Sequence, residues 1–193
     1  MPLFIGFKQI KTASKSVLRL LSIVLLFLYI LEGTAVASEA ELTNIVIRNL
    51  NDDLVVDLRI KGVFTAEMRE AVLSGILVRF TFLILLDEVH DLWFDKKIAG
   101  IKTVHQIQYD ALKNEFQITR AWEKGGTLVV KDPEAAQAAI SEVSGLAVLP
   151  LAKLKNGRNY QLRVKSELHD KKFHFWSFPW EFETDWYTIN FIY

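Results

Sequence analysis

The feature that most constrains the fold of this chain is a regular alternation of apolar and polar residues. Between residues 54 and 61 the polar side chains Asp57, Arg59 and Lys61 fall on one face of an extended segment. The opposite face carries the apolar residues Leu54, Val56, Leu58 and Ile60. Side chains that alternate with a period of two point to opposite faces of a strand, so this segment predicts a strand with one buried face. Residues 42–48 predict a partner strand, joined to it by the turn-rich residues 49–52.

Five further strands are predicted along the chain. Residues 77–86 are apolar on both faces, which is typical of a central strand covered on both sides. Residues 101–109 and 115–122 predict a hairpin, and residues 127–130 a short strand after Lys124-Gly125-Gly126. Asn156-Gly157 lies between two apolar runs and predicts another hairpin that leads into a strand over residues 160–168.

Two short helices interrupt these strands. Thr65 can cap a helix over residues 66–74 that Gly75 ends. Asp132, followed by Pro133 at the first helical position, opens a helix over residues 133–144 that Gly145 closes. The pattern predicts an α+β fold, mostly antiparallel β, with sandwich-like sheets and two short helices after an N-terminal signal or anchor helix. We expect a single mainly-β domain over residues 38–193.

The first 37 residues differ from the rest. A positive region without acids is followed by twelve uncharged residues, 20–31, and then by small residues at Ala35 and Ala37, where a signal peptidase would read them. A helix of twelve residues spans about 18 Å, less than the ~30 Å hydrocarbon core of a bilayer. We expect a signal peptide cleaved after Ala37; an uncleaved membrane anchor is the alternative. The protein is therefore predicted to be exported to the periplasm, either free or tethered to the inner membrane.

Charge and cysteine content exclude several classes of protein. Residues 38–193 carry 19 basic and 22 acidic residues, a net charge of −3. This balance argues against a nucleic-acid partner and against a polybasic membrane patch. Membrane contact is expected only through the N-terminal segment, if that segment is not cleaved. The chain has no cysteine, so its fold holds without disulfides and thiol chemistry is excluded.

The candidate chemistry is sparse. Glu88 and His90 would face the same side of a strand, where a divalent metal could use both, and a metal-assisted hydrolase built on them is one hypothesis. A strand that runs out into a solvated loop explains the same residues. Ser74 and Ser144 precede helix-ending glycines and do not form a nucleophile elbow. We therefore predict a non-enzymatic protein with no catalytic, cofactor-binding or metal residues and no cofactor.

The last 21 residues hold ten of the 23 aromatic residues of the chain. In residues 176–183 the aromatic side chains alternate with polar ones or Pro179 and so share one face. This face either closes the core or forms an exposed edge that binds a protein or another envelope component. The candidate interaction residues are Trp176, Phe178, Trp180, Phe182 and Trp186. Alternation up to Tyr193 is also typical of the last strand of an outer-membrane barrel, but two capped helices interrupt the chain.

Residues 41–186 resemble an uncharacterised bacterial family, domain of unknown function 4390. The resemblance rests on the first strand pair, on residues 70–76 before the apolar strand, on Trp93-Phe94-Asp95, on residues 150–154 before Gly157, and on Asp185-Trp186. The chain departs from the family at residues 76–78, where the family often has a proline. The resemblance implies an exported protein and no known activity. We expect a periplasmic binding domain of unknown role; the alternative is a structural or signalling accessory protein anchored in the inner membrane.

Overall fold

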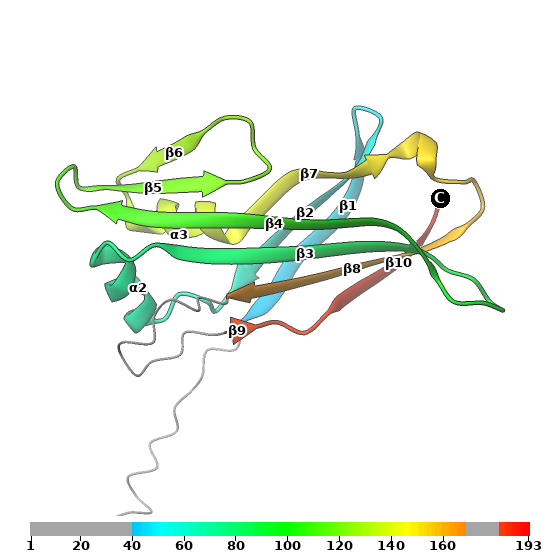
Figure 1. Ribbon diagram of the computed structural model, residues 1–193, viewed down its shortest axis with the longest axis horizontal. Helices are drawn as coiled ribbons and strands as arrows, with labels where there is room; N and C mark the ends of the chain where they lie inside the picture. The colour runs from blue at the N-terminus through cyan, green and yellow to red at the C-terminus, as the bar shows by residue number, and fades with distance from the viewer. Residues whose placement is uncertain (1–39, 169–181) are drawn as a thin grey trace, which may run out of the picture. The chain divides into compact units, whose positions relative to one another are not determined.

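The computed structural model of the chain describes residues 40–168 and 182–193. Contacts within the chain separate Ser38–Tyr193 from Met1–Ala37. The expected signal or anchor segment, with Ala35 and Ala37, lies outside the described residues. In chain order the described elements are β1 (Glu41–Leu50), β2 (Asp53–Lys61), α2 (Ala66–Leu73), β3 (Val78–Glu88), β4 (Lys96–Asp110), β5 (Glu115–Arg120), β6 (Thr127–Val130), α3 (Pro133–Ser141), β7 (Glu142–Pro150), the 3-10 turn η1 (Leu151–Lys153), β8 (Asn159–Leu168), β9 (Phe182–Glu183) and β10 (Tyr187–Ile192) (Figure 1).

The described strands form two antiparallel sheets. The smaller sheet has the order β1-β2-β7, and the larger has the order β10-β8-β3-β4-β5-β6, with β9 paired to β8. The β1–β2 hairpin turns at Asn51 and Asp52, which both adopt positive φ. This is the conformation that a two-residue hairpin turn requires. The predicted α+β class, with mostly antiparallel, sandwich-like sheets and two short helices, is confirmed.

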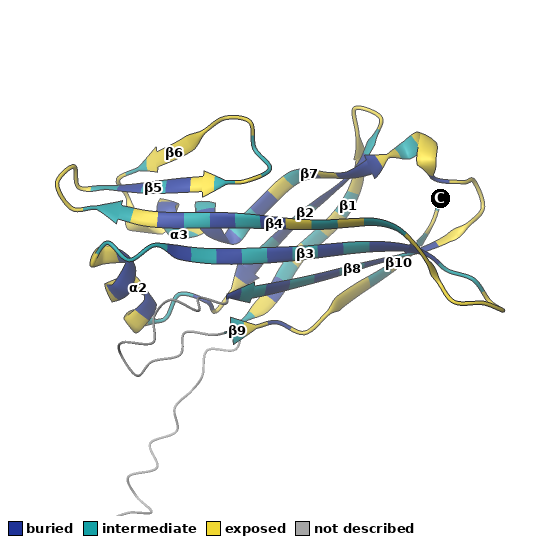
Figure 2. Ribbon diagram, viewed as in Figure 1, coloured by how far each residue is buried: buried dark blue, intermediate teal, exposed yellow. Residues whose placement is uncertain are grey.

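One apolar core is shared by both sheets. Alternate residues of β2, β3, β7 and β8 are buried, and they join a single cluster with residues of both helices. Figure 2 shows this alternation along β3 and β8. Full burial of a large apolar side chain stabilises a fold by about 1.5–3 kcal/mol, so these strands supply most of the stability of the domain. The largest fully buried side chains of the cluster include Phe80, Phe82, Ile84, Tyr160 and Leu162.

Strand β3 is central, as predicted, but only one of its faces is buried. Leu83 and Leu85 on its outer face are half-buried. Their partners in register are Lys102, Lys165 and Arg163 on the neighbouring strands. Long basic side chains can cover apolar surface with their methylene stems while their charged ends stay in water. Within the described residues, β3 is thus buried on one face and half-buried on the other, which falls short of the prediction that both faces are covered.

Both helices begin where the sequence predicts. The Thr65 hydroxyl accepts a hydrogen bond from Met68 N at 3.3 Å, and the Asp132 carboxylate accepts one from Ala135 N at 2.7 Å. Helix α2 ends at Leu73, one residue before the expected position, and Gly75 follows with a φ of +82°. Helix α3 contacts β2, β4, β5 and β6. It therefore packs beside the part of the larger sheet that β4 and β5 form.

The end of α3 differs from the prediction. The helix stops at Ser141, and β7 begins at once with Glu142. Gly145, expected to close the helix, lies inside β7 with a φ of +71° and donates its N–H to Asp57 Oδ1 at 2.6 Å. The register between β2 and β7 shifts at this point, which is typical of a β-bulge. Gly145 thus supplies the positive φ of a β-bulge and does not end the helix.

The predicted hairpin at Asn156-Gly157 is also wrong. Gly157 does have the positive φ of a turn, at +73°. The strands on either side, however, belong to different sheets: β7 pairs with β2, whereas β8 pairs with β3 and β10. This turn therefore carries the chain from one sheet to the other.

Candidate functional site

The candidate interaction residues divide into three groups. Trp176, Phe178 and Trp180 lie outside the described residues. Phe182 is half-buried, and its ring lies 5.7 Å from that of Phe80, so it packs against the core. Trp186 is 40% exposed. Of the described candidates, Trp186 therefore belongs to the surface and Phe182 to the core edge.

Contacts with β8 fix the segment before β10. The buried hydroxyl of Thr184 accepts a hydrogen bond from Ser166 N at 3.0 Å, while Thr184 N donates to Ser166 O at 2.9 Å. Lys165 forms an ion pair with Glu183. These contacts hold Trp186 in place on the surface.

Two cations lie close to the ring of Trp186. Lys165 Nζ is 5.6 Å and Arg163 Cζ is 5.8 Å from the ring centroid. Arg163 also bonds Asp87 at 2.7 Å, so Asp87, Arg163 and Trp186 form a chain of contacts from β3 to the edge of the sheet. Cations within about 6 Å of a Trp ring stabilise its position.

An open groove of about 380 Å³ adjoins this tryptophan. It lies between the first residues of β1 and the segment that leads into β10. Three of its side chains are carboxylates, and two are aromatic. The lining residues are Ala40, Glu41, Leu42, Glu183, Thr184, Asp185, Trp186 and Tyr187. This combination of carboxylates with exposed aromatic rings suits a cationic side chain.

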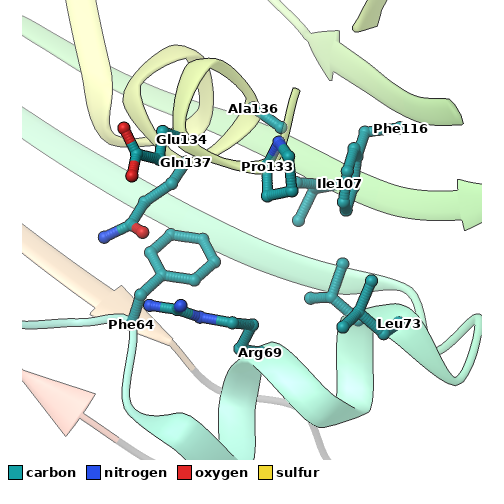
Figure 3. A pocket seen from close by; sticks show the side chains of 10 residues that line it. Phe64, Arg69, Leu73, Ile107, Phe116, Pro133, Glu134, Ala136 and Gln137 are labelled. Carbon is teal, nitrogen blue, oxygen red and sulfur yellow. The ribbon is translucent and has the colours of Figure 1, made fainter. Parts of the chain in front are cut away.

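A second cavity, of about 220 Å³, lies between the two helices. Figure 3 shows Arg69 and Leu73 of α2 on one side of it, and Pro133, Glu134 and Gln137 of α3 on the other. Ile107 and Phe116, which are buried, form its base. Its volume is below the ~300–1,000 Å³ typical of small-molecule sites, so we regard it as a gap between helices.

Glu88 lies beside two basic side chains at the end of β3. Glu88 is only 3% exposed, and its carboxylate lies 3.7 Å from Lys155 Nζ and 3.8 Å from Arg158 Nε. His90 follows the end of β3, and its backbone N–H donates to Asp95. Within residues 40–168 and 182–193, no group of three or more His, Cys, Asp or Glu residues is placed to hold a metal ion.

Sequence reasoning did not single out His105, which lies at the centre of a buried polar network. Trp122 Nε1 donates to His105 Nε2 at 3.1 Å, and His105 Nδ1 lies 3.0 Å from the carbonyl oxygen of Ile140. Because Nε2 accepts, Nδ1 carries the proton and donates to Ile140 in the neutral imidazole. Burial lowers the pKa of His105 to about 4, so the ring is neutral near pH 7. The sequence does hold a signal for the burial of His105. In the predicted strand over residues 101–109, His105 falls on the same face as the apolar residue Ile107.

Sequence reasoning also missed an exposed apolar loop. Leu92, Trp93 and Phe94 lie between β3 and β4 and are exposed by 88, 82 and 98%. A run of adjacent apolar residues usually indicates a buried segment, so the sequence alone did not suggest that these three residues are exposed. The available signal was its position between Asp91 and Asp95, where the strand pattern has already stopped.

Together the fold and these surfaces define a mainly antiparallel α+β domain with exposed aromatic residues. Among the described residues, no helix is both long and apolar enough to cross a membrane. The chain belongs to the family described as Domain of unknown function (DUF4390), whose model matches residues 37–190. The resemblance predicted from the sequence is therefore confirmed. Comparisons with curated proteins and with solved structures found no match.

Proposed function

We propose that this chain is a non-enzymatic domain of the bacterial envelope that captures an extended, basic segment of a partner protein along β10. The observation that supports this function is the groove beside Trp186, in which three carboxylate residues and two aromatic residues meet at the end of a sheet. The proposed partner would contribute a strand and at least one Lys or Arg side chain.

The position of β10 makes it suitable for strand addition. It is the last strand in the order of the larger sheet, and among the described strands it pairs with β8 alone. Its second backbone edge can therefore form hydrogen bonds with another extended segment. Tyr187 and Ile192 are exposed on this strand and would contact side chains of the added segment.

The groove would supply the preference for a basic partner. Glu183 already pairs with Lys165, whereas Glu41 and Asp185 line the groove and are exposed. Carboxylates that meet an arginine or lysine form charge-assisted hydrogen bonds, which are stronger than neutral ones. The aromatic faces of Trp186 and Tyr187 would pack against the apolar stem of the same side chain.

Site-directed photocrosslinking in cells tests the proposed edge. A photoreactive residue is placed at Thr188 in the full chain, and a matched control at Leu128 on β6, the opposite edge of the same sheet. We expect a discrete protein adduct at position 188 that is absent at position 128. The double change Glu41→Lys and Asp185→Lys should remove the adduct, whereas Glu134→Lys on α3 should not. Equal adducts at both edges, or an adduct that survives the charge reversal, would contradict the proposal.

Export is tested separately, by cell fractionation and mass spectrometry of the N-terminus. The proposal expects a periplasmic chain that begins at Ser38. An intact N-terminus in the inner membrane would indicate the anchored alternative, in which the same domain works beside the membrane. A cytoplasmic chain that retains Met1 would contradict a function in the envelope.

A further inference from the structure

The loop between β3 and β4 exposes three adjacent apolar side chains that the fold does not use. Leu92, Trp93 and Phe94 form the only such run in the part of the chain that the structure describes. The loop lies at the far right of Figure 1 and is exposed in Figure 2. Contiguous exposed apolar surface is uncommon on soluble proteins and typically marks a binding surface.

The ends of this loop are well defined. Asp87 and Glu88 of β3 pair with Lys97 and Lys96 of β4. Beyond them, His90 N donates to Asp95 Oδ1 at 3.2 Å. The three apolar residues thus stand at the tip of a closed hairpin. All three side chains are at least 82% exposed, so they are not buried against one another.

The charges around this tip are mixed and balanced. Lys96 follows the loop directly and is exposed, whereas the ammonium group of Lys97 lies back along β4, over Gly100. Lys155 and Arg158 reach the same place, because both pair with Glu88 at the end of β3. Lys96, Lys155 and Arg158 thus accompany three carboxylates near the tip, Glu88, Asp91 and Asp95. Lysine and arginine beside an apolar tip complement the phosphates of lipid headgroups.

We propose that the loop of Leu92, Trp93 and Phe94 inserts into the headgroup region of a phospholipid membrane. Tryptophan is favoured at the membrane interface, since its ring is amphipathic, and phenylalanine and leucine gain from leaving water. The backbone polar groups of the loop oppose deeper entry into hydrocarbon, so insertion stops at the interface. A lipid layer adapts to three exposed side chains at the tip of a hairpin, whereas a protein partner would need a preformed pocket for all three.

This contact is additional to any membrane contact made by the N-terminal segment, and it does not depend on the proposed function. It rests on residues 87–97, whereas the function rests on β10 and the groove. The proposed insertion departs from the prediction that only the N-terminal segment meets the membrane, and that prediction stays untested.

A polarity-sensitive fluorophore tests the insertion. Because the chain has no cysteine, Asp91→Cys in the full chain carries a single label at the tip. Leu112→Cys provides the matched control in the exposed turn between β4 and β5. We expect phosphatidylethanolamine–phosphatidylglycerol vesicles to shift the emission of the label at 91 to the blue and leave the label at 112 unchanged. The double change Trp93→Ser and Phe94→Ser should abolish the shift at 91.

Tethering by the N-terminal segment alone would not depend on Trp93 and Phe94, so the double serine change distinguishes it from insertion of the tip. A label at 91 that stays in water on vesicle-bound protein would overturn the proposal. So would a blue shift that survives the double serine change. A photocrosslinker at position 93 that gives a discrete protein adduct in cells, with no lipid adduct, would assign the tip to a protein partner and likewise overturn it.

Discussion

The middle of β4 and the loop that precedes this strand differ sharply in how much they contribute to the stability of the fold. Around His105 each ring nitrogen has a partner, and the side chain is fully buried. At the other end of the strand, the loop that precedes Lys96 leaves its three apolar residues in water. One region stabilises the domain, and the other contributes little to its stability.

This difference separates structural residues from binding residues. Removal of a buried group with paired hydrogen bonds destabilises a protein, since its partners are left unpaired. Removal of an exposed apolar group changes stability little but weakens whatever that group binds. The four predictions below test the comparison in order of decreasing effect on stability.

The largest effect is expected for His105→Leu. The substitution leaves the Ile140 carbonyl without its donor and the Trp122 indole N–H without its acceptor. We expect the free energy of unfolding to fall by about 3 kcal/mol. Urea denaturation at pH 7.5, followed by circular dichroism, measures it. A loss below about 1 kcal/mol would show that the network around His105 is dispensable.

The second effect is a pH dependence. The pKa of His105 is about 4 in the folded state, below its ordinary value of 6.5. The unfolded state therefore binds the proton first, and stability that is complete above pH 6.5 is lost as the pH falls toward 4. Between pH 7 and pH 5 the unfolding free energy should fall by about 2 kcal/mol more in the wild type than in His105→Gln. Parallel curves for the two proteins would contradict the neutral, buried ring.

A smaller effect distinguishes the loops at the two ends of β4. The Asp110 carboxylate accepts hydrogen bonds from the backbone N–H groups of Leu112 and Lys113 at 3.0 and 3.1 Å. Asp95 accepts one, from His90. We expect Asp110→Ala to destabilise the domain by about 1 kcal/mol and Asp95→Ala by about half of that. Urea denaturation of the two variants gives the ranking, and a reversed order would show that the β3–β4 loop is the more structured of the two.

The smallest effect on stability is expected at the tip itself. The change Trp93→Ser and Phe94→Ser should alter the free energy of unfolding by no more than about 0.5 kcal/mol, because both side chains are already in water. Leu112→Ser, at a residue 99% exposed in the opposite turn, is the control. Thermal unfolding of the three proteins should give overlapping curves. A clear loss of stability in the double variant alone would show that the tip packs against the domain.

Local patterns predicted most of this fold, because strand alternation and helix caps are set by neighbouring residues. They failed where a distant partner decides the outcome. Gly145 suits a helix end as well as a bulge, and Asp57 on another strand selects the bulge. Asn156-Gly157 indicates a turn, but no local signal tells which sheet the next strand joins.

The candidate sites show the same division. The sequence predicted an aromatic C-terminal edge, of which the structure describes Phe182 against the core and Trp186 on the surface. The surface position of Trp186 depends on contacts with β8. The sequence did not identify the tip at residues 92–94, because adjacent apolar residues look the same in a core strand and in an exposed loop. Whether a residue is buried depends on which strands pack together in the folded protein, and the local sequence does not determine this.

The central claim is that the exposed apolar tip at residues 92–94 binds a membrane and does not stabilise the fold. Hydrogen exchange of the full chain tests it most directly, with and without phosphatidylethanolamine–phosphatidylglycerol vesicles. Within residues 40–168 and 182–193, we expect vesicles to slow exchange at residues 89–97 and to leave the amides around His105 and the turn at residues 111–114 unchanged. Unchanged exchange at 89–97 on vesicle-bound protein, or equal protection of both loops, would contradict it.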